Sequence, residues 1–370
     1  MKRPTFLPLL SAIFLLVGLV ASKAAQSIVD VFGPDAANGT SVAQFISSAS
    51  GFNSPKVHPV NSTSFDWWYF DAVSEDQQYS IVVIFFISSY RAFPFISGST
   101  ILPTIITISS SEDDLLTGAE AFAEEATIVT TGDGATGLWK DTGFSFAGTE
   151  DMSSYTISVN ASGIQGTFTM DTISPPHYPC ALAGANESML LMPHIGWANS
   201  IPDSIGKVDF NVNGTDVNFT GVGYHDKNWA DKPMNDTVAS WYWGHGRLGP
   251  YTVVWFDALS LNNAAEYASG YVTQNSSVLT NGCLAASVRP LGSNTSYPPT
   301  ASNDLPTGFN VSISLDSGDT LVFQVELVSV IAGGTGIYSR WVAALTGGLV
   351  GGSGESWNGT AVTEQFVFDD

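Results

Sequence analysis

The residue types best suited to chemistry gather between positions 223 and 251. Within that stretch the segment WYWGHGR reads as a β-strand, and every second residue of a strand points to the same face. Aromatic bulk beside a few hydrogen-bond donors is typical of a pocket wall for a hydrophobic ligand. The alternative is a buried histidine next to an arginine stacked on tryptophan. The residues that share this face are Trp241, Trp243, His245 and Arg247.

Two further clusters carry polar groups beside aromatic ones. The segment GYHDKNW holds His225, Asp226, Asn228 and Trp229. The segment FDWWYFD spans Phe65–Asp71, and its four consecutive aromatic residues put two rings on each face of a strand. Asp66 and Asp71 are an odd number of residues apart, so they point to opposite faces. The alternative for this segment is an ordinary core strand with its acids in solvent.

The sequence offers little support for other catalytic chemistries. His225, Asp226 and His245 are metal-ligand types, but no HExxH, HxH or facial-triad spacing is present, so no metal site is predicted. There is no G-x-S-x-G motif for a serine hydrolase. Glycosidases need two positioned carboxylates, and with 34 acidic residues the presence of acids decides nothing. A sugar-binding module that uses exposed tryptophans stays open.

The elements that must position these residues are strands. A period of two dominates the hydrophobic pattern, and Gly, Asn, Asp, Ser or Pro bound each run. Asn213-Gly214 between two such runs predicts a hairpin. Leu115–Glu125 is the best helix candidate. The pattern predicts an all-β sandwich or barrel. The expected strands are Tyr79–Ile87, Tyr155–Val159, Gly166–Met170, Val208–Val212, Thr252–Phe256, Thr320–Leu327 and Gln365–Phe368.

The composition of the chain disfavours some classes of binding partner. The 370 residues include 12 Lys+Arg and 34 Asp+Glu, which gives a net charge of −22. Nucleic acid and anionic membrane surfaces are disfavoured, because both need clustered cations. A hydrophobic content of 44% argues against disorder. The polar stretch Asp231–Thr237 divides two strand-rich blocks and predicts a domain boundary. The Gly347–Gly354 loop lacks the phosphate-binding pattern and predicts a turn.

The N-terminus predicts export. Residues 1–25 combine a basic start, a short apolar run and small residues, which indicates a secretory signal peptide cleaved near Ala25 and no stable membrane anchor. Cys180 and Cys283 are the two cysteines, either paired in a disulfide or left as buried thiols. Eleven glycosylation sequons support entry into the secretory pathway: Asn38, Asn61, Asn160, Asn186, Asn213, Asn218, Asn235, Asn275, Asn294, Asn310 and Asn358.

Three motifs in order carry a family resemblance. FDWWYFD, GVGYHDKN and WYWGHGRLGPY resemble the hydroxyneurosporene-synthase/AttH-like group, which includes bacterial carotenoid hydratases and fungal Diels–Alderases. The resemblance implies a two-domain lipocalin-like architecture with an N-terminal β-sandwich (26–232), a C-terminal β-barrel (233–370) and a ligand pocket between them. The expected substrate-binding residues are Asp66, Trp68, Tyr69, Asn228, Trp229, Trp241, Trp243 and Tyr251.

Within this group the chain looks most like the fungal hetero-Diels–Alderases, which join a tropolone-type quinone methide to a humulene-type sesquiterpene. The resemblance implies a cofactor-independent pericyclase of secondary metabolism whose substrates are small hydrophobic polyene and aromatic molecules. Asp226 with His225 is the expected general acid for a preceding dehydration, carried over from the D-x-N-W motif of the hydratases, whose pattern continues with Gly where this chain has Ala230. His245 and Arg247 are the expected donors to a carbonyl.

Four alternatives stay open beside this hypothesis. The chain could be a decalin-forming Diels–Alderase or an isoprenoid hydratase or isomerase of the same fold. It could also be a non-catalytic lipocalin-like carrier or a sugar-binding protein. Exposed strands allow a homodimer, although nothing in the sequence requires one.

Overall fold

The computed structural model describes residues 26–111, 117–261, 264–351 and 354–368, and in these ranges the protein is all-β, as predicted. The described residues form 24 strands and one short 3-10 helix, η1 (Met234–Asp236). None of their helices is long and apolar enough to cross a membrane. The predicted signal peptide lies outside the described residues.

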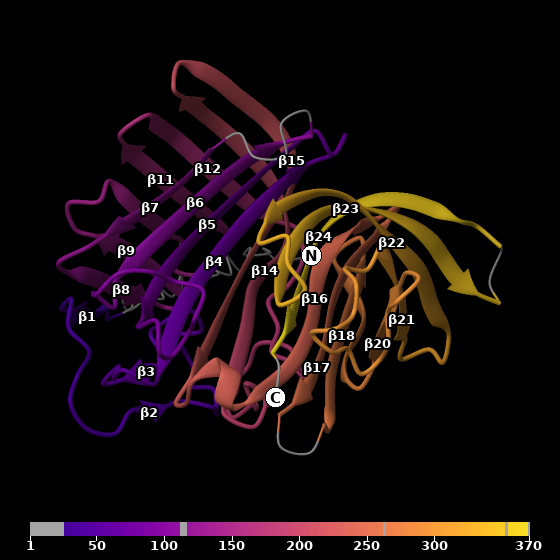
Figure 1. Cartoon of the computed structure of the whole chain (residues 1–370), viewed down its shortest axis with the longest axis horizontal. Helices are drawn as coiled ribbons and strands as arrows, with labels where there is room; N and C mark the ends of the chain where they lie inside the picture. The colour runs from indigo at the N-terminus through magenta and orange to yellow at the C-terminus, as the bar shows by residue number, and fades with distance from the viewer. Residues whose placement is uncertain (1–25, 112–116, 262–263, 352–353, 369–370) are drawn as a thin grey trace, which may run out of the picture.

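The first sheet contains thirteen strands and curves back on itself (Figure 1). Aromatic rings from its two halves contact each other. The ring centroids of Trp68 and Trp139 lie 6.0 Å apart, and those of Phe70 and Phe146 lie 5.2 Å apart. The sheet therefore forms two facing layers around a core of its own. Its strands, in spatial order, are β1 (Ile28–Phe32), β8 (Ala126–Thr131), β9 (Gly134–Trp139), β10 (Phe144–Gly148), β11 (Ser154–Ala161), β12 (Ile164–Thr172), β14 (Ile195–Val212), β15 (Thr215–Ala230), β4 (Phe65–Ser74), β5 (Tyr79–Ser88), β6 (Pro103–Ser110) and β7 (Thr117–Phe122), with β13 (Leu190–Met192) beside β14.

The second sheet contains nine strands and closes almost completely into a barrel. The end strand β20 approaches the opposite side of the sheet, where its Val288 N–H donates to the Asp257 carboxylate on β17 (2.9 Å). Its spatial order is β19 (Ser277–Cys283), β18 (Glu266–Gln274), β17 (Tyr251–Ser260), β16 (Val238–Leu248), β24 (Trp357–Val367), β23 (Tyr338–Val350), β22 (Thr320–Ala332), β21 (Gly308–Ser314) and β20 (Ala286–Leu291). A separate small sheet pairs β2 (Val42–Ala43) with β3 (Val57–His58).

The chain passes from the first sheet to the second between Ala230, the end of β15, and Val238, the start of β16. The predicted hairpin joins β14 to β15, and its turn residues Asn213 and Gly214 both have positive φ values. This turn suits the pair because Gly has no Cβ and Asn tolerates the left-handed region. The ends of these two strands remote from the turn lie beside the second sheet, whereas the turn projects away from it (Figure 1).

Two predicted elements differ from the structure. The predicted Gly347–Gly354 turn starts later, because residues 347–350 belong to β23, and the predicted helix is a strand. The described part of the helix candidate Leu115–Glu125 contains the edge strand β7 (Thr117–Phe122), whose side chains alternate between half-buried and exposed. Gly118 and the β-branched Thr117 are poor helix formers, and pairing with β6 satisfies the backbone of this segment. The alternation of a strand therefore outweighs the weak helical pattern.

Three hydrophobic cores follow from strand alternation. Core 1 lies inside the folded first sheet and includes Trp68, Phe70 and Trp229. Core 2 lies between the two sheets and includes Trp67 and Trp243. Core 3 fills the barrel, and its members include Tyr242, Leu248, Tyr251, Trp255 and Phe323. Alternate residues of β4, β15 and β16 thus enter different cores.

The structure confirms the disulfide between Cys180 and Cys283, whose Cα atoms lie 4.8 Å apart. The sequon asparagines lie where the sequence placed them, at the surface: ten of the eleven are exposed, and Asn61 is half-buried. Asn61 donates from its amide to the Gly39 carbonyl (2.9 Å). Glycan attachment itself stays a prediction.

A candidate active site between the two sheets

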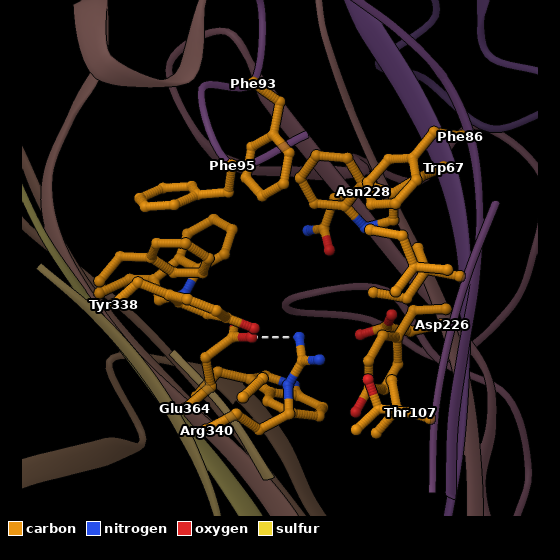
Figure 2. A pocket seen from close by; sticks show the side chains of 18 of the residues that line it. Trp67, Phe86, Phe93, Phe95, Thr107, Asp226, Asn228, Tyr338, Arg340 and Glu364 are labelled. Carbon is orange, nitrogen blue, oxygen red and sulfur yellow. Dashed lines mark hydrogen bonds and ion pairs between the residues drawn. The ribbon is translucent and has the colours of Figure 1, made fainter. Parts of the chain in front are cut away.

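A cavity of about 230 Å³ opens within core 2, between the two sheets (Figure 2). Aromatic and aliphatic side chains make most of its wall, with a small number of polar groups among them, which is the usual composition of a small-molecule site. The lining residues are Trp67, Tyr69, Val82, Ile84, Phe86, Phe93, Phe95, Ile105, Thr107, Asp226, Asn228, Trp241, Trp243, Phe256, Ala332, Tyr338, Arg340, Glu364 and Phe366.

Strand alternation selects which predicted residues reach the cavity. On β15, Asp226 and Asn228 are two residues apart and share the face that points to the second sheet. Tyr69 on the neighbouring strand β4 faces the same way. From the barrel side, β16 contributes Trp241 and Trp243. These five predicted residues line the cavity together.

Asp226 is the polar group best placed for proton transfer. Its residue is 3% exposed. Its Oδ2 accepts hydrogen bonds from the Trp197 indole N–H (2.7 Å) and the Tyr224 hydroxyl (2.8 Å). Burial raises its pKa to about 7; the two hydrogen bonds oppose that change, and the negative charges of Asp71 and Glu364 reinforce it. Asp226 can therefore carry a proton near neutral pH and release it to a bound molecule.

A buried ion pair lies on the opposite side of the cavity from Asp226 (Figure 2). Arg340 Nη2 on β23 pairs with Glu364 Oε2 on β24. The Trp241 indole N–H donates to the other Glu364 oxygen (3.1 Å), and the guanidinium carbon lies 4.7 Å from the centre of the Tyr69 ring. Burial raises the pKa of Glu364, and the Arg340 cation opposes that rise. The pair brings a fixed dipole to a largely apolar wall.

A second polar chain supports this wall from behind. The Tyr69 hydroxyl donates to Asp71 (2.5 Å), and His245 Nε2 lies 2.8 Å and 2.9 Å from the two Asp71 oxygens. The His245 ring stacks on Tyr224, with centroids 4.1 Å apart. Tyr224 in turn donates to Asp226. His245 was predicted to contact substrate, but it does not line the cavity; it holds the Asp71 and Tyr224 side chains in place.

Four predicted site residues enter core 1 instead of the cavity, because they occupy the other face of their strands. Asp66 forms a buried ion pair with Lys227. Trp68 donates from its indole to the Asn53 carbonyl (3.0 Å), and Trp229 donates to the Gln44 carbonyl (2.8 Å). The fourth is His225, treated next.

His225 lies back to back with Asp226 across β15, so the predicted acid pair does not form. Its ring stacks on Phe70 with centroids 3.9 Å apart, and its Nδ1 lies 2.8 Å from the Tyr69 carbonyl oxygen. Its Nε2 lies 2.8 Å from the Asn53 amide nitrogen. Burial lowers its pKa to about 3, so this imidazole is a neutral member of the core.

Arg247 and Tyr251 also lie away from the cavity. Arg247 points toward the first sheet, like the other residues on its face of β16. At that position it contacts β14 and not the cavity. Its Nη2 and Nε donate to the two oxygens of Asp203 (2.6 Å and 3.1 Å). Tyr251 packs in core 3, inside the barrel. Neither side chain can contact a molecule in the cavity between the sheets.

Sequence reasoning missed the residues that the barrel and the β5–β6 connection supply. Arg340 and Glu364 lie on β23 and β24, and no sequence motif predicts that these strands face the first sheet. Phe93 and Phe95 lie in the connection between β5 and β6 and pack toward β24. The ring centroids of Phe95 and Phe366 are 5.1 Å apart. An arginine and a glutamate inside two strand-like runs were the available signal, since such charges are rarely buried without a partner. Among the described residues, no three His, Cys, Asp or Glu side chains gather into a metal site.

Two curved antiparallel sheets with an aromatic cavity between them give the chain a lipocalin-like fold. Comparisons agree: residues 23–289 match the Diels-Alderase-like family model, and the chain belongs to that family. A solved structure titled CghA with Sch210972 has the same fold, with a TM-score of 0.76 at 20% identity, covering 92% of this chain and 99% of that one.

Two relatives match nearly the whole chain. The quinolone epoxide rearrangement protein asqO of Emericella nidulans is 37% identical over 342 residues, covering 90% of this chain and 92% of that protein. The quinolone epoxide rearrangement protein penF of Penicillium thymicola is 35% identical over 346 residues, with 90% and 93% covered. Family and relatives together support an enzyme of the cyclase or isomerase type. None of these names mentions a tropolone or a sesquiterpene.

Proposed function

We propose that this chain catalyses the acid-assisted rearrangement of an epoxide carried by a neutral aromatic substrate. The observation that carries the proposal is the Asp226 carboxyl, which is buried, faces an aromatic cavity and has its pKa raised to about 7. Epoxide oxygen is a poor leaving group until it is protonated, and a positioned acid at neutral pH supplies that proton. The names of the two relatives that match 90% of this chain support the choice of an epoxide.

The proposed reaction is an isomerisation, so protons and atoms balance within one substrate. Asp226 gives its proton to the epoxide oxygen as one C–O bond breaks, which leaves a hydroxyl group and a cation-like carbon. An O–H, N–H or C–H group of the same substrate then forms the new bond to that carbon; its bond to hydrogen breaks, and the proton returns to the Asp226 carboxylate. The faces of Trp67, Trp241 and Trp243 stabilise the cationic carbon through their ring quadrupoles.

The test compares wild type with Asp226→Asn on a quinolone epoxide. Asn keeps an acceptor for Trp197 and Tyr224 but cannot act as an acid, so we expect a loss of about 100-fold or more in kcat. The wild-type rate falls as pH rises through about 7, since the acid form is the active one. The exposed Asp236→Asn variant is the matched control. Full activity of Asp226→Asn contradicts the proposal.

Solvent labelling separates isomerisation from hydration. In ¹⁸O-water, a rearranged product has the mass of the substrate and carries no label. A hydratase or epoxide hydrolase adds one labelled oxygen, and mass spectrometry distinguishes the two outcomes.

A second candidate is the hetero-Diels–Alder reaction between a tropolone-type quinone methide and a humulene-type sesquiterpene. The aromatic walls on both sheets favour it, because two flat or conjugated partners can stack between them. Holding the partners in a reactive pose can supply up to about 7–11 kcal/mol. Chiral analysis of the products decides: a mixture identical to that formed without enzyme argues against cycloaddition. Asp226→Asn then loses rate only from the hydroxylated precursor.

We also propose that the protein enters the secretory pathway. The exposure of ten of the eleven sequon asparagines and the Cys180–Cys283 disulfide support this location. Protein purified from its native host is expected to lose mass on treatment with an N-glycosidase. An unchanged mass would count against glycosylation.

A further inference from the structure

One polar group in the cavity has no role in the proton transfer. The Asn228 carboxamide lines the cavity, and the residue is 5% exposed. Its amide nitrogen donates a long hydrogen bond to the Gly196 carbonyl (3.4 Å). Its Oδ1 accepts no hydrogen bond from any residue that the structure describes. The Oδ1 atom faces the cavity without a partner in the protein, so a ligand that fills the cavity must donate to it or leave it unpaired at a cost in free energy.

We propose that Asn228 recognises the edge of a secondary lactam in the substrate. This inference rests on the proposed function, which supplies the quinolone ring system that contains the lactam. A carboxamide presents an N–H donor and a C=O acceptor side by side in one plane. A lactam has the same two groups on one edge, because its ring holds the amide cis. Two antiparallel hydrogen bonds then form between the two amides.

The charges around the cavity favour a neutral ligand of this kind. Arg340 is the one lysine or arginine among the described residues that line the cavity, and it is already paired with Glu364, which makes it a poor partner for a carboxylate or phosphate. Figure 2 shows the Asn228 carboxamide pointing into the space that Phe93 and Trp67 border. Aromatic faces there can cover a fused aromatic lactam while its polar edge meets the amide.

The position of Asn228 also relates the lactam to the reacting group. Asn228 and Asp226 share one face of β15 two residues apart, which is about 7 Å along a strand. A substrate whose lactam edge is held by Asn228 therefore presents another part of its skeleton to the acid. The lactam fixes the orientation of the substrate. The epoxide is expected about 7 Å from the lactam edge, which is the distance between residues i and i+2 of a strand.

Three neutral probes of nearly equal shape test this recognition. 2-Quinolone has the lactam N–H, coumarin replaces it with oxygen, and N-methyl-2-quinolone blocks it. Ligand-observed NMR titration gives a Kd for each. Wild type is expected to bind 2-quinolone about 5- to 150-fold more tightly than the other two. Asn228→Leu is expected to bind all three about equally. The control Asn211→Leu, at an exposed asparagine outside the cavity, keeps the preference.

Several outcomes overturn the inference: equal binding of the three probes to wild type, no measurable binding of 2-quinolone, or a preference that Asn228→Leu retains. If Asn228→Leu does not fold, Asn228→Ala takes its place, since a methyl side chain neither accepts from the lactam N–H nor donates to its carbonyl and should lose the preference. Turnover gives a separate result. A wild type that prefers the lactam but leaves a quinolone epoxide unchanged refutes the proposed function and leaves lactam recognition intact.

Discussion

Asp226 shows how neighbours give an ordinary carboxyl an unusual property. Trp197 and Tyr224 hold one of its oxygens, and burial makes its charged form costly. Tyr224 is itself fixed by stacking on His245, whose partner is Asp71. A residue predicted as a catalytic donor therefore acts on the acid only through the tyrosine between them.

The raised pKa of Asp226 predicts a pH dependence of stability. The folded protein keeps this carboxyl protonated up to about pH 7, whereas the unfolded chain releases the proton near pH 4. The folded state thus binds more protons between these values, and its stability falls as pH rises through that window. The difference between 3.8 and about 7 sets an upper limit of about 4 kcal/mol.

Urea unfolding of wild type and Asp226→Asn at pH 4 and pH 8 measures this effect. Asn cannot ionise, so the variant is expected to gain stability relative to wild type at the higher pH. The comparison is needed because the buried His177 and His225, whose pKa values burial lowers to about 4 and about 3, change stability in the opposite sense with pH. Equal differences at both pH values would rule out a buried, titrating Asp226.

At the scale of the element, alternation was predictable and the facing neighbours were not. WYWGHGR on β16 does put Trp241, Trp243, His245 and Arg247 on one face, as the sequence predicted. What lies opposite changes along the strand, because two curved sheets diverge from each other. The two tryptophans border the cavity, while the next two residues reach Asp71 and Asp203.

The same reasoning explains which other predictions from the sequence were right and which were wrong. The sequence predicted an all-β chain and the β14–β15 hairpin, since period, turn residues and aromatic content are local signals. It also placed Asp66 and Asp71 on opposite faces correctly. It could not decide which face meets the other sheet, so Trp68 and Trp229 were assigned to the pocket and Arg340 was missed. That choice depends on contacts between strands far apart in the chain.

Arg247 is expected to brace the sheets rather than to act in the reaction. It joins β16 to β14 through two hydrogen bonds to Asp203, whose side chain is 1% exposed and also accepts from the Thr252 hydroxyl (2.7 Å). Arg247→Met leaves that carboxylate buried without its cation, which costs about 3–5 kcal/mol. Adding Asp203→Asn recovers part of the loss.

Urea unfolding of the single and double variants measures this coupling, with the exposed Arg91→Met as the control. Well below the unfolding transition, Arg247→Met is expected to keep the wild-type kcat, because the side chain does not reach the cavity. A large loss of kcat in a fully folded variant would return Arg247 to the catalytic machinery.

At the scale of the whole molecule, the cavity exists only while the two sheets stay docked. Residues 173–189, which connect β12 to β13, lie against the barrel. The Tyr271 hydroxyl on β18 donates to the Pro175 carbonyl (2.8 Å), and the Ser269 hydroxyl donates to the Pro179 carbonyl (2.5 Å). His177 from the same connection stacks on Tyr271, with centroids 4.0 Å apart. The disulfide from Cys180 anchors this segment to β19.

The disulfide is therefore expected to stabilise the docked arrangement as well as to restrict the unfolded chain. Its cysteines are 103 residues apart, a loop for which the chain-entropy model gives about 4.7 kcal/mol, while measured losses on removing a native disulfide are about 2–5 kcal/mol. The double variant Cys180→Ser/Cys283→Ser should lose that much in the free energy of unfolding. Wild type with reductant should match it, and reductant should not change the variant. Equal urea midpoints for oxidised and reduced wild type would show that noncovalent contacts alone hold residues 173–189 on the barrel.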